Sequence, residues 1–246
     1  MLGLITALTR LLNMYFAAPL VPFLTRLGIH FRHPNAPLRD NTLTLELLVM
    51  LLLLIFFFVA RLTLSVEKPG TVQNIAEIIN EFVSSQGEAI IGHGYEPHVV
   101  YATMVFLFIV LCNFGGLFPG LETPTANPVV PLGVALLTFA YYNWNGIRAQ
   151  GPIGYVKHFA GPIWWVAPLL FPIEIISHLA RIMSLTIRLY ANMFASDLLT
   201  LVFFSMVPLG LPVVFLGLHF GVALIQAYVF MLLTLIYLSQ AVAVEH

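Results

Sequence analysis

The sequence predicts an all-α integral membrane protein with about five membrane-embedded helices and additional interfacial helices. Of its 246 residues, 60% are hydrophobic and 9% are charged, whereas a typical soluble domain has about 25% charged residues. Apolar runs recur along the chain, and two of them are longer than a bilayer is thick. Charges are too few to cover a water-soluble globule of this size, so the composition excludes a soluble domain and a disordered chain.

Net charge and cysteine content exclude further classes of protein. The formal net charge is −1, and a nucleic-acid-binding surface needs clustered Lys and Arg. The single cysteine, Cys112, lies in an apolar run and supports neither a disulfide framework nor a Cys-rich metal site. The N-terminus lacks the basic start of a signal peptide, and Arg10 interrupts the stretch where an apolar core belongs. We therefore expect the membrane spans themselves to direct insertion.

Residues 1–42 are predicted to form an N-terminal interfacial and polar segment. Between residues 4 and 16, apolar side chains occupy one helical face and polar side chains the other, which is typical of a helix at the membrane interface. Pro19 and Pro22 end this helix, and a polar stretch follows. Residues 43–246 are predicted to form a single membrane domain.

The first part of the membrane domain contains three spans of ordinary length and one amphipathic helix. The spans are predicted over about 43–64, 99–118 and 129–146, and the third ends at Asn143, Asn145 and Gly146. The amphipathic helix covers residues 72–91. Its polar face is acidic rather than basic, which fits a neighbouring protein and a solvated face about equally.

The last two apolar stretches, residues 164–207 and 212–244, are too long for upright spans. At 1.5 Å per residue, a helix over 172–207 would be about 54 Å long and one over 212–244 about 50 Å, against a hydrocarbon thickness of about 30 Å. Either each stretch splits into two helices, or the pair forms a steeply inclined hairpin joined near Pro208–Pro212. No Pro or Gly interrupts residues 173–207, so we favour the inclined hairpin.

The basic residues indicate only part of the topology. Arg61 and Lys68 follow the first span, and Arg148 and Lys157 follow the third, while the connections after the second and fourth spans and the C-terminal end carry no Lys or Arg. This alternation places the segment after the first span, the loop after the third span and the C-terminus inside. The N-terminal segment, which carries several arginines, would then lie outside against the same rule, so its orientation stays open.

Ionisable side chains are embedded in the two long stretches, where each costs at least about 2.5–3.5 kcal/mol. At 100° per residue, one stripe of the first stretch holds Glu174, His178, Arg181, Arg188 and Asn192. Asp197 points to the opposite side of that helix, and His219 and Gln226, seven residues apart, share a face of the last one. These groups either pair with one another to hold the bundle together or serve a function.

How strongly the sequence favours internal pairing or a function differs from residue to residue. For His178 and Arg181 they are balanced. Arg188 is harder to pair within the chain, because Glu174, the closest acid on its stripe, is about 21 Å away at helical rise. Its partner would then come from another chain. His219 alone fits a satisfied core histidine, whereas beside Asp197 and Gln226 it fits a proton relay.

The sequence lacks the common motifs of nucleotide and hydrolase sites, including G-x-x-x-x-G-K-[ST], G-x-G-x-x-G, H-E-x-x-H and G-x-S-x-G. We therefore expect no catalytic site, no cofactor and no bound nucleotide in this chain.

Two motifs in the long stretches carry a resemblance. One is RLYANMFASDL from Arg188, preceded by Glu174 and Ser184, and the other is HFGVALIQAYVFMLLTLIYLS from His219. Together they resemble subunit a of the F-type ATP synthase, over residues 98–246 and more loosely before them. The resemblance implies a non-catalytic stator subunit of a proton-transporting ATP synthase, whose inclined helices pack against a rotating ring of c subunits and form two offset half-channels.

The resemblance also implies roles for single residues. Arg188 matches the arginine beside the ring's proton-carrying carboxylate, where its charge stops protons from passing directly between the half-channels; Asn192 belongs to the same motif. The residues that match the outer half-channel are Asn113, Asp197, His219 and Gln226, and those that match the inner one are Glu174 and Ser184. The family commonly has Glu in place of Asp197, and some members have an acid in place of Gly116, so we expect the outer path to be built differently here.

Partners and location follow partly from the resemblance and partly from the residues. The implied partners are the c-subunit ring, the peripheral-stalk b subunits and the lipid bilayer. We expect a bacterial plasma (inner) membrane, because no transit peptide is visible, while an organelle inner membrane remains an alternative. The rival function is a self-contained proton or ion transporter, which would be expected to show an internal repeat. The coupling ion and the size of the ring stay open.

Overall fold

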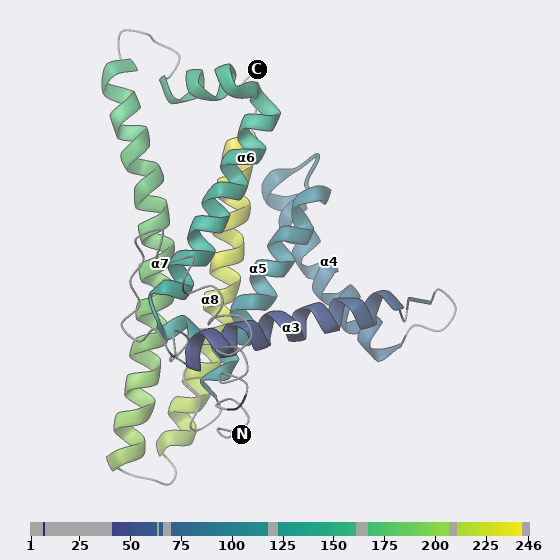
Figure 1. The fold of residues 1–246 in the computed structure, drawn as a ribbon, viewed down its shortest axis with the longest axis vertical. Coiled ribbons are helices and arrows are strands. Elements are labelled where there is room, and N and C mark those ends of the chain that lie inside the picture. Colours follow the sequence, from purple (N-terminus) through teal and green to yellow (C-terminus); the bar gives the residue numbers. More distant parts are fainter. Residues whose placement is uncertain are drawn as a thin grey trace.

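The computed structural model describes residues 41–62, 64–65, 70–117, 123–160, 167–206 and 211–242, together with residue 7 (Figure 1). The predicted interfacial helix, apart from residue 7, and residues 208–210 of the predicted turn lie outside this set. The described helices are α3 (Asn41–Leu62), α4 (Thr71–Ile91), α5 (Glu96–Gly115), η2 (Pro124–Ala126), α6 (Val129–Ala160), α7 (Ala167–Met206) and α8 (Leu211–Val242). The described ranges contain no strand, so the predicted all-α fold is confirmed for them.

Four described helices are long and apolar enough to cross a membrane: α3, α5, α7 and α8. The stretch predicted as a further span begins α6, which does not join these four because Asn143 and Asn145 reduce its apolar content. α6 nevertheless packs directly against both α7 and α8.

The predicted end of α6 is wrong. Asn143 and Asn145 stay helical because their side-chain amides donate to backbone carbonyls one turn earlier, to Phe139 O at 2.6 Å and to Tyr141 O at 2.8 Å. The α-helix continues to Gly151, whose φ of 74° kinks it. Glycine adopts this left-handed conformation without the penalty that a Cβ imposes.

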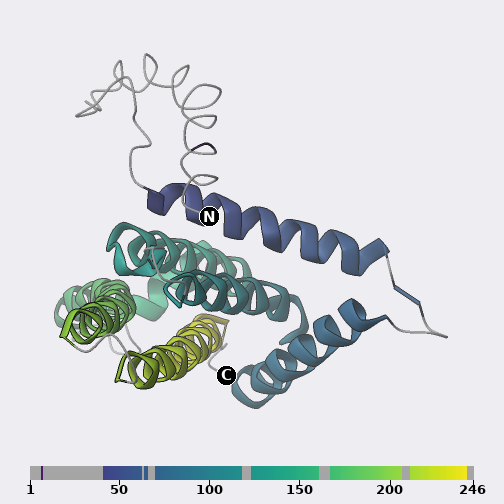
Figure 2. The same ribbon diagram turned by 90° about the horizontal axis from the view of Figure 1, so that it is seen from below.

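α7 and α8 are single helices of 40 and 32 residues. The alternative in which each stretch splits into two is therefore wrong. By helical rise, α7 is about 60 Å long, roughly twice the hydrocarbon thickness. Figures 1 and 2 show α7 beside α8, with α3 running across the bundle rather than along it. Since α3 and the long pair cannot all stand upright in one bilayer, this crossing agrees with a steep inclination of α7 and α8.

The core is apolar and lies between α5, α6, α7 and α8. Its buried members are Val105, Ile109, Val110, Ala135, Ile182, Leu185, Leu189, Met193, Ala223, Ala227 and Phe230. Small side chains such as Ala223 and Ala227 let neighbouring helix backbones approach closely, as is usual in membrane bundles. Tight packing along this seam fixes the register of α7 against α8.

We expect Leu189→Ala to destabilise the chain by about 2–5 kcal/mol, the usual cost of truncating a fully buried leucine. Leu189 is 0% exposed. Leu201→Ala is the matched control, because Leu201 has the same side chain on the same helix but is 73% exposed. The aggregation temperature of the detergent-solubilised protein should fall for Leu189→Ala and stay at the parent value for Leu201→Ala. Equal aggregation temperatures for the two variants would contradict the packing described.

α4 packs its apolar face on α5 and α8. Val83 is fully buried there, and Tyr228 Oη donates to Gln86 Oε1 at 3.2 Å while Ser239 Oγ donates to Ile90 O at 3.1 Å. The acidic side, with Glu77 and Glu81, remains exposed in this chain. Both predicted explanations of that face, a protein neighbour and a solvated surface, are compatible with this arrangement.

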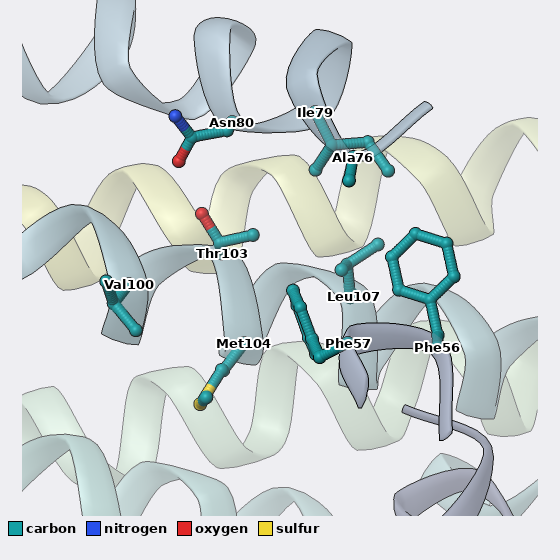
Figure 3. Close-up of a pocket in the computed structure, with 9 residues that line it drawn as sticks. All are labelled: Phe56, Phe57, Ala76, Ile79, Asn80, Val100, Thr103, Met104 and Leu107. Carbon is teal, nitrogen blue, oxygen red and sulfur yellow. The ribbon is translucent and has the colours of Figure 1, made fainter. Parts of the chain in front are cut away.

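A cleft of about 300 Å³ opens between α3, α4 and α5 (Figure 3). Its walls are formed by Phe56, Phe57, Ala76, Ile79, Asn80, Val100, Thr103, Met104 and Leu107. Apolar side chains dominate, and the Asn80 amide and Thr103 hydroxyl mark its polar side (Figure 3). None of the candidate site residues lines this cleft.

Candidate functional site

His219 is the centre of a buried polar cluster that joins α5, α7 and α8. Its side chain is 2% exposed. Nδ1 lies 2.8 Å from Ser196 Oγ and 3.3 Å from Asp197 Oδ1, both on α7. On the other side of the ring, Nε2 lies 3.2 Å from the backbone oxygen of Asn113. The structure thus brings three of the predicted residues together and adds Ser196.

The Asn113 side chain ties the end of α5 to two other elements. Asn113 Nδ2 donates to Ala223 O of α8 at 3.2 Å, and Asn113 Oδ1 accepts from Thr125 Oγ1 of η2 at 2.6 Å. The residue is fully buried. Its backbone carbonyl and its amide therefore both serve to position α8 beside α5.

A second polar contact joins α7 and α8 two turns from His219 towards the C-terminus of α8. Asn192 Nδ2 donates to Gln226 Oε1 at 2.8 Å. Gln226 is buried, whereas Asn192 is exposed at the edge of the pair. The contact links the inner polar face of α8 to the exposed side of α7 on which Ser184 also lies.

Arg188 is half-buried on α7, and its contacts are weak. Its Nη2 donates to Ser184 Oγ at 3.3 Å. Among the described residues no carboxylate forms an ion pair with it: the two ion pairs found there join Glu174 to His178 and Asp197 to His219. The prediction that the counter-charge of Arg188 comes from another chain therefore stays consistent with the described part of the protein.

The first half of α7 carries a separate polar group. His178 Nε2 lies 3.5 Å from Glu174 Oε1, and His178 Nδ1 lies 2.7 Å from the Tyr142 hydroxyl of α6. The guanidinium carbon of Arg181 lies 5.1 Å from the centre of the Tyr237 ring of α8, a cation–π contact. His178 and Arg181 thus have partners within the bundle, which is compatible with both alternatives.

Sequence reasoning missed three hydroxyl groups in these clusters: Ser196, Thr125 and Tyr142. Ser196 precedes Asp197, so its position beside a predicted residue was a usable signal. Thr125 and Tyr142 carried none, because they reach Asn113 and His178 only through the packing of separate helices. No group of three or more His, Cys, Asp or Glu side chains in the described ranges is arranged to hold a metal ion.

Gly116 lies between the His219 ring and the Thr123 hydroxyl. A Cβ at this position would overlap Thr123 Oγ1 and lie 3.1 Å from both Cε1 and Nε2 of His219. The φ of Gly116 is −68°, which any residue adopts, so close packing rather than backbone conformation requires glycine. The side chain that some family members carry here has no room in this arrangement.

We expect Gly116→Ala to destabilise the protein by about 1–3 kcal/mol, the usual cost of overpacking. The adjacent Gly115→Ala provides the control, because its Cβ would meet only Pro124 Cδ at 3.5 Å, an ordinary contact. Thermal aggregation of the two solubilised variants compares them directly. Equal stability of Gly116→Ala and Gly115→Ala would mean that the Thr123 side chain can move aside without loss of stability.

Comparisons with known proteins agree with the arrangement. The family described as ATP synthase A chain matches residues 43–239. The chain is 55% identical over 238 residues to ATP synthase subunit a of Koribacter versatilis (strain Ellin345), covering 97% of each chain. It is 44% identical over 219 residues to that of Solibacter usitatus (strain Ellin6076), covering 89% of this chain and 94% of the relative. With that of Helicobacter hepaticus (strain ATCC 51449 / 3B1), identity is 42% over 181 residues, or 72% and 79% of the two chains.

Four apolar helices and these bacterial relatives identify a multi-pass integral membrane protein of the bacterial inner membrane. The match extends over most of the described helices, from α3 to α8, and over nearly the full length of one relative. The chain belongs to the ATP synthase A chain family.

Proposed function

We propose that this chain conducts protons as a stator subunit in the membrane sector of an F-type ATP synthase. In this proposal two half-channels, offset along α7 and α8, open to opposite sides of the membrane. A proton crosses only by binding to a rotating ring and travelling with it from one half-channel to the other. Each proton releases about 2.3 kcal/mol per 100 mV, and the rotation delivers that energy to catalytic subunits elsewhere in the complex.

The observation that carries the proposal is the placement of Arg188. It lies in a helix long and apolar enough to span a membrane, half-buried, with no ion pair to any described carboxylate. An arginine stays charged in such surroundings, where a lysine would more readily lose its proton. An uncompensated charge inside a membrane is costly, so a carboxylate supplied by the ring would satisfy Arg188 and be held ionised by it.

The outer half-channel in this proposal consists of the His219 cluster and its neighbours. Asp197 and His219 are within 3.3 Å of each other, and Asn113 contacts the same imidazole. The Asn192–Gln226 hydrogen bond adds a further pair of polar groups between α7 and α8. These contacts support a route by which protons pass between hydrogen-bonding groups inside an otherwise apolar bundle.

The inner half-channel is assigned to the polar group around Glu174. Ser184 lies between Glu174 and Arg188 along α7 and accepts a hydrogen bond from the arginine. The Glu174 side chain is 33% exposed, which supports contact with water at one membrane face. His178 orients Glu174 in this scheme, since the imidazole contacts both the carboxylate and Tyr142.

The c-subunit ring is proposed to pack against the exposed apolar surface of α7 and α8. Large apolar side chains project there without cover from this chain, among them Ile176, Met183, Ile187, Phe194, Leu218 and Ile225. Soluble monomers do not expose surface of this extent. The peripheral-stalk b subunits are assigned to the α3 and α4 side, where α3 is largely exposed and α4 presents its acidic face.

Photo-crosslinking in the assembled complex tests the ring contact. A photoreactive residue replaces Ile187, which adjoins Arg188 and is 53% exposed, or Val100 on α5, which is 60% exposed. We expect the probe at 187 to label c subunits and the probe at 100 to label lipid or other subunits. Labelling of c subunits from 100 and not from 187 would contradict the proposal. If neither probe labelled c subunits, the result would favour a self-contained transporter.

A further inference from the structure

We propose that Ser196 is a positioning residue of the outer proton path, whose hydroxyl group allows His219 to gain and lose its proton at Nδ1. The inference rests on the proposed function and adds a residue to it. Ser196 is 7% exposed and lies on α7 directly before Asp197. Its hydroxyl oxygen is closer to His219 Nδ1, at 2.8 Å, than the Asp197 carboxylate, at 3.3 Å.

The partner of Nε2 fixes which nitrogen of His219 exchanges the proton. Nε2 lies 3.2 Å from the backbone oxygen of Asn113. A carbonyl oxygen can only accept, so Nε2 must carry a hydrogen for this contact to be a hydrogen bond. In the neutral imidazole the other nitrogen then has no hydrogen. Uptake therefore adds one proton to Nδ1, and release removes the same proton.

Ser196 can form a hydrogen bond with Nδ1 whether His219 is neutral or protonated, whereas an ionised Asp197 can do so only when His219 is protonated. The neutral Nδ1 needs a donor, which a hydroxyl can be and an ionised carboxylate cannot. The protonated Nδ1 is a donor, and then the Ser196 oxygen accepts while Asp197 supplies the opposite charge. Rotation of one hydroxyl hydrogen is enough to pass between the states, so neither the imidazole ring nor a helix has to move.

No other described ionisable side chain forms a hydrogen bond or an ion pair with His219. α5 contributes the Asn113 carbonyl, and the turn that follows α5 contributes Gly116. Thr123 lies on the other side of Gly116 and does not titrate. Asp197 is thus the charge that competes with Ser196 for Nδ1.

Removal of each partner should shift the protonation of His219 in opposite directions. Among the described residues, Ser196 is the one side chain that can donate to neutral Nδ1. Ser196→Ala removes this donor but leaves Asp197 for the protonated form, so the protonation midpoint rises. Asp197→Asn removes the charge that favours the protonated form, so the midpoint falls. A net hydrogen bond of ordinary strength corresponds to an upward shift of about 0.5–1 pH unit for Ser196→Ala. A residue that only fills space would shift neither.

ATP synthesis by inverted membrane vesicles, driven by a fixed potential at a series of lumenal pH values, measures these shifts. His219→Gln identifies the limb of the pH profile that belongs to His219, because that limb disappears. We expect Ser196→Ala to move the midpoint of this limb upwards, Asp197→Asn to move it downwards, and Ser196→Thr, which keeps the hydroxyl, to restore the parent midpoint. The amount of assembled complex is determined for every variant.

Separate outcomes overturn the inference and the proposed function. If Ser196→Ala keeps the parent midpoint, or shifts it in the same direction as Asp197→Asn, the role of Ser196 is wrong. If His219→Gln and Asp197→Asn both keep the parent rate and profile, the assignment of the outer path itself is wrong. Should Ser196→Ala fail to assemble, Ser196→Cys replaces it, because a thiol of similar size is a weak donor and predicts the same upward shift.

Discussion

Arg188→Ala is expected to abolish both ATP synthesis and ATP-driven proton pumping in membrane vesicles while leaving the complex assembled. In the proposed function, a carboxylate of the ring would then enter an apolar interface without its counter-charge, at a cost of about 3–5 kcal/mol. Each 1.4 kcal/mol corresponds to a tenfold change in rate, so the loss should be at least about hundredfold. Arg188→Lys should retain more activity but not the parent level, because lysine keeps a charge only where it holds its proton.

Arg181→Ala is the control for the loss of a positive charge from the same helix. Arg181 contacts the Tyr237 ring, and a cation–π contact of this kind contributes about 0.5–2 kcal/mol. We expect a lower thermal stability of the complex with most of the proton pumping kept. If Arg181→Ala stopped pumping and Arg188→Ala did not, the assignment of Arg188 as the ring-facing charge would have to be withdrawn.

His219→Leu is expected to lower ATP synthesis by about hundredfold or more, the usual contribution of a positioned proton-transfer group. Leucine fills most of the space of the imidazole ring but can neither accept nor donate a proton. It also removes a contact of Asp197 and of Ser196, both of which lie within 3.3 Å of Nδ1. Synthesis in inverted vesicles at saturating ADP and phosphate measures the effect.

His98→Leu separates this loss from the general cost of removing a buried histidine. His98 is 7% exposed, and its Nδ1 lies 3.2 Å from the Tyr141 hydroxyl of α6, away from the His219 cluster. We expect His98→Leu to reduce stability and to leave the rate per assembled complex within a few-fold of the parent. Equal losses of rate in the two variants would mean that His219 acts only by packing.

The sequence was sufficient to predict the helices whose position depends on local composition. Apolar runs predicted where α3, α5, α7 and α8 lie, because an apolar stretch of spanning length has few alternatives to a membrane helix. The absence of Pro and Gly from residues 173–207 correctly favoured one long helix. The end of α6 could not be predicted in this way, since Asn143 and Asn145 satisfy their amides on the preceding turn of their own helix.

The contacts of the candidate site depend on tertiary packing that no sequence period encodes. Periodicity indicated correctly that His219 and Gln226 share a face of α8, since the side chains of both contact α7. It did not indicate that Asn113 would reach α8, which lies 110 positions further along the chain. Nor did it show that Ser196 would lie closer than Asp197 to the imidazole. The proton-translocation roles of these residues stay predictions.

Passive proton flux through vesicle membranes, with the catalytic sector inhibited and a potential imposed, tests the central claim most directly. The parent should be tight, because in the proposed function protons cross only when the ring turns. Arg188→Ala should leak, because nothing then separates the two half-channels, and Arg188→Ala combined with His219→Leu should be tight again, because the outer path is closed. A leak that persists in the double variant, or a tight Arg188→Ala membrane with the complex assembled, would contradict two half-channels separated by Arg188.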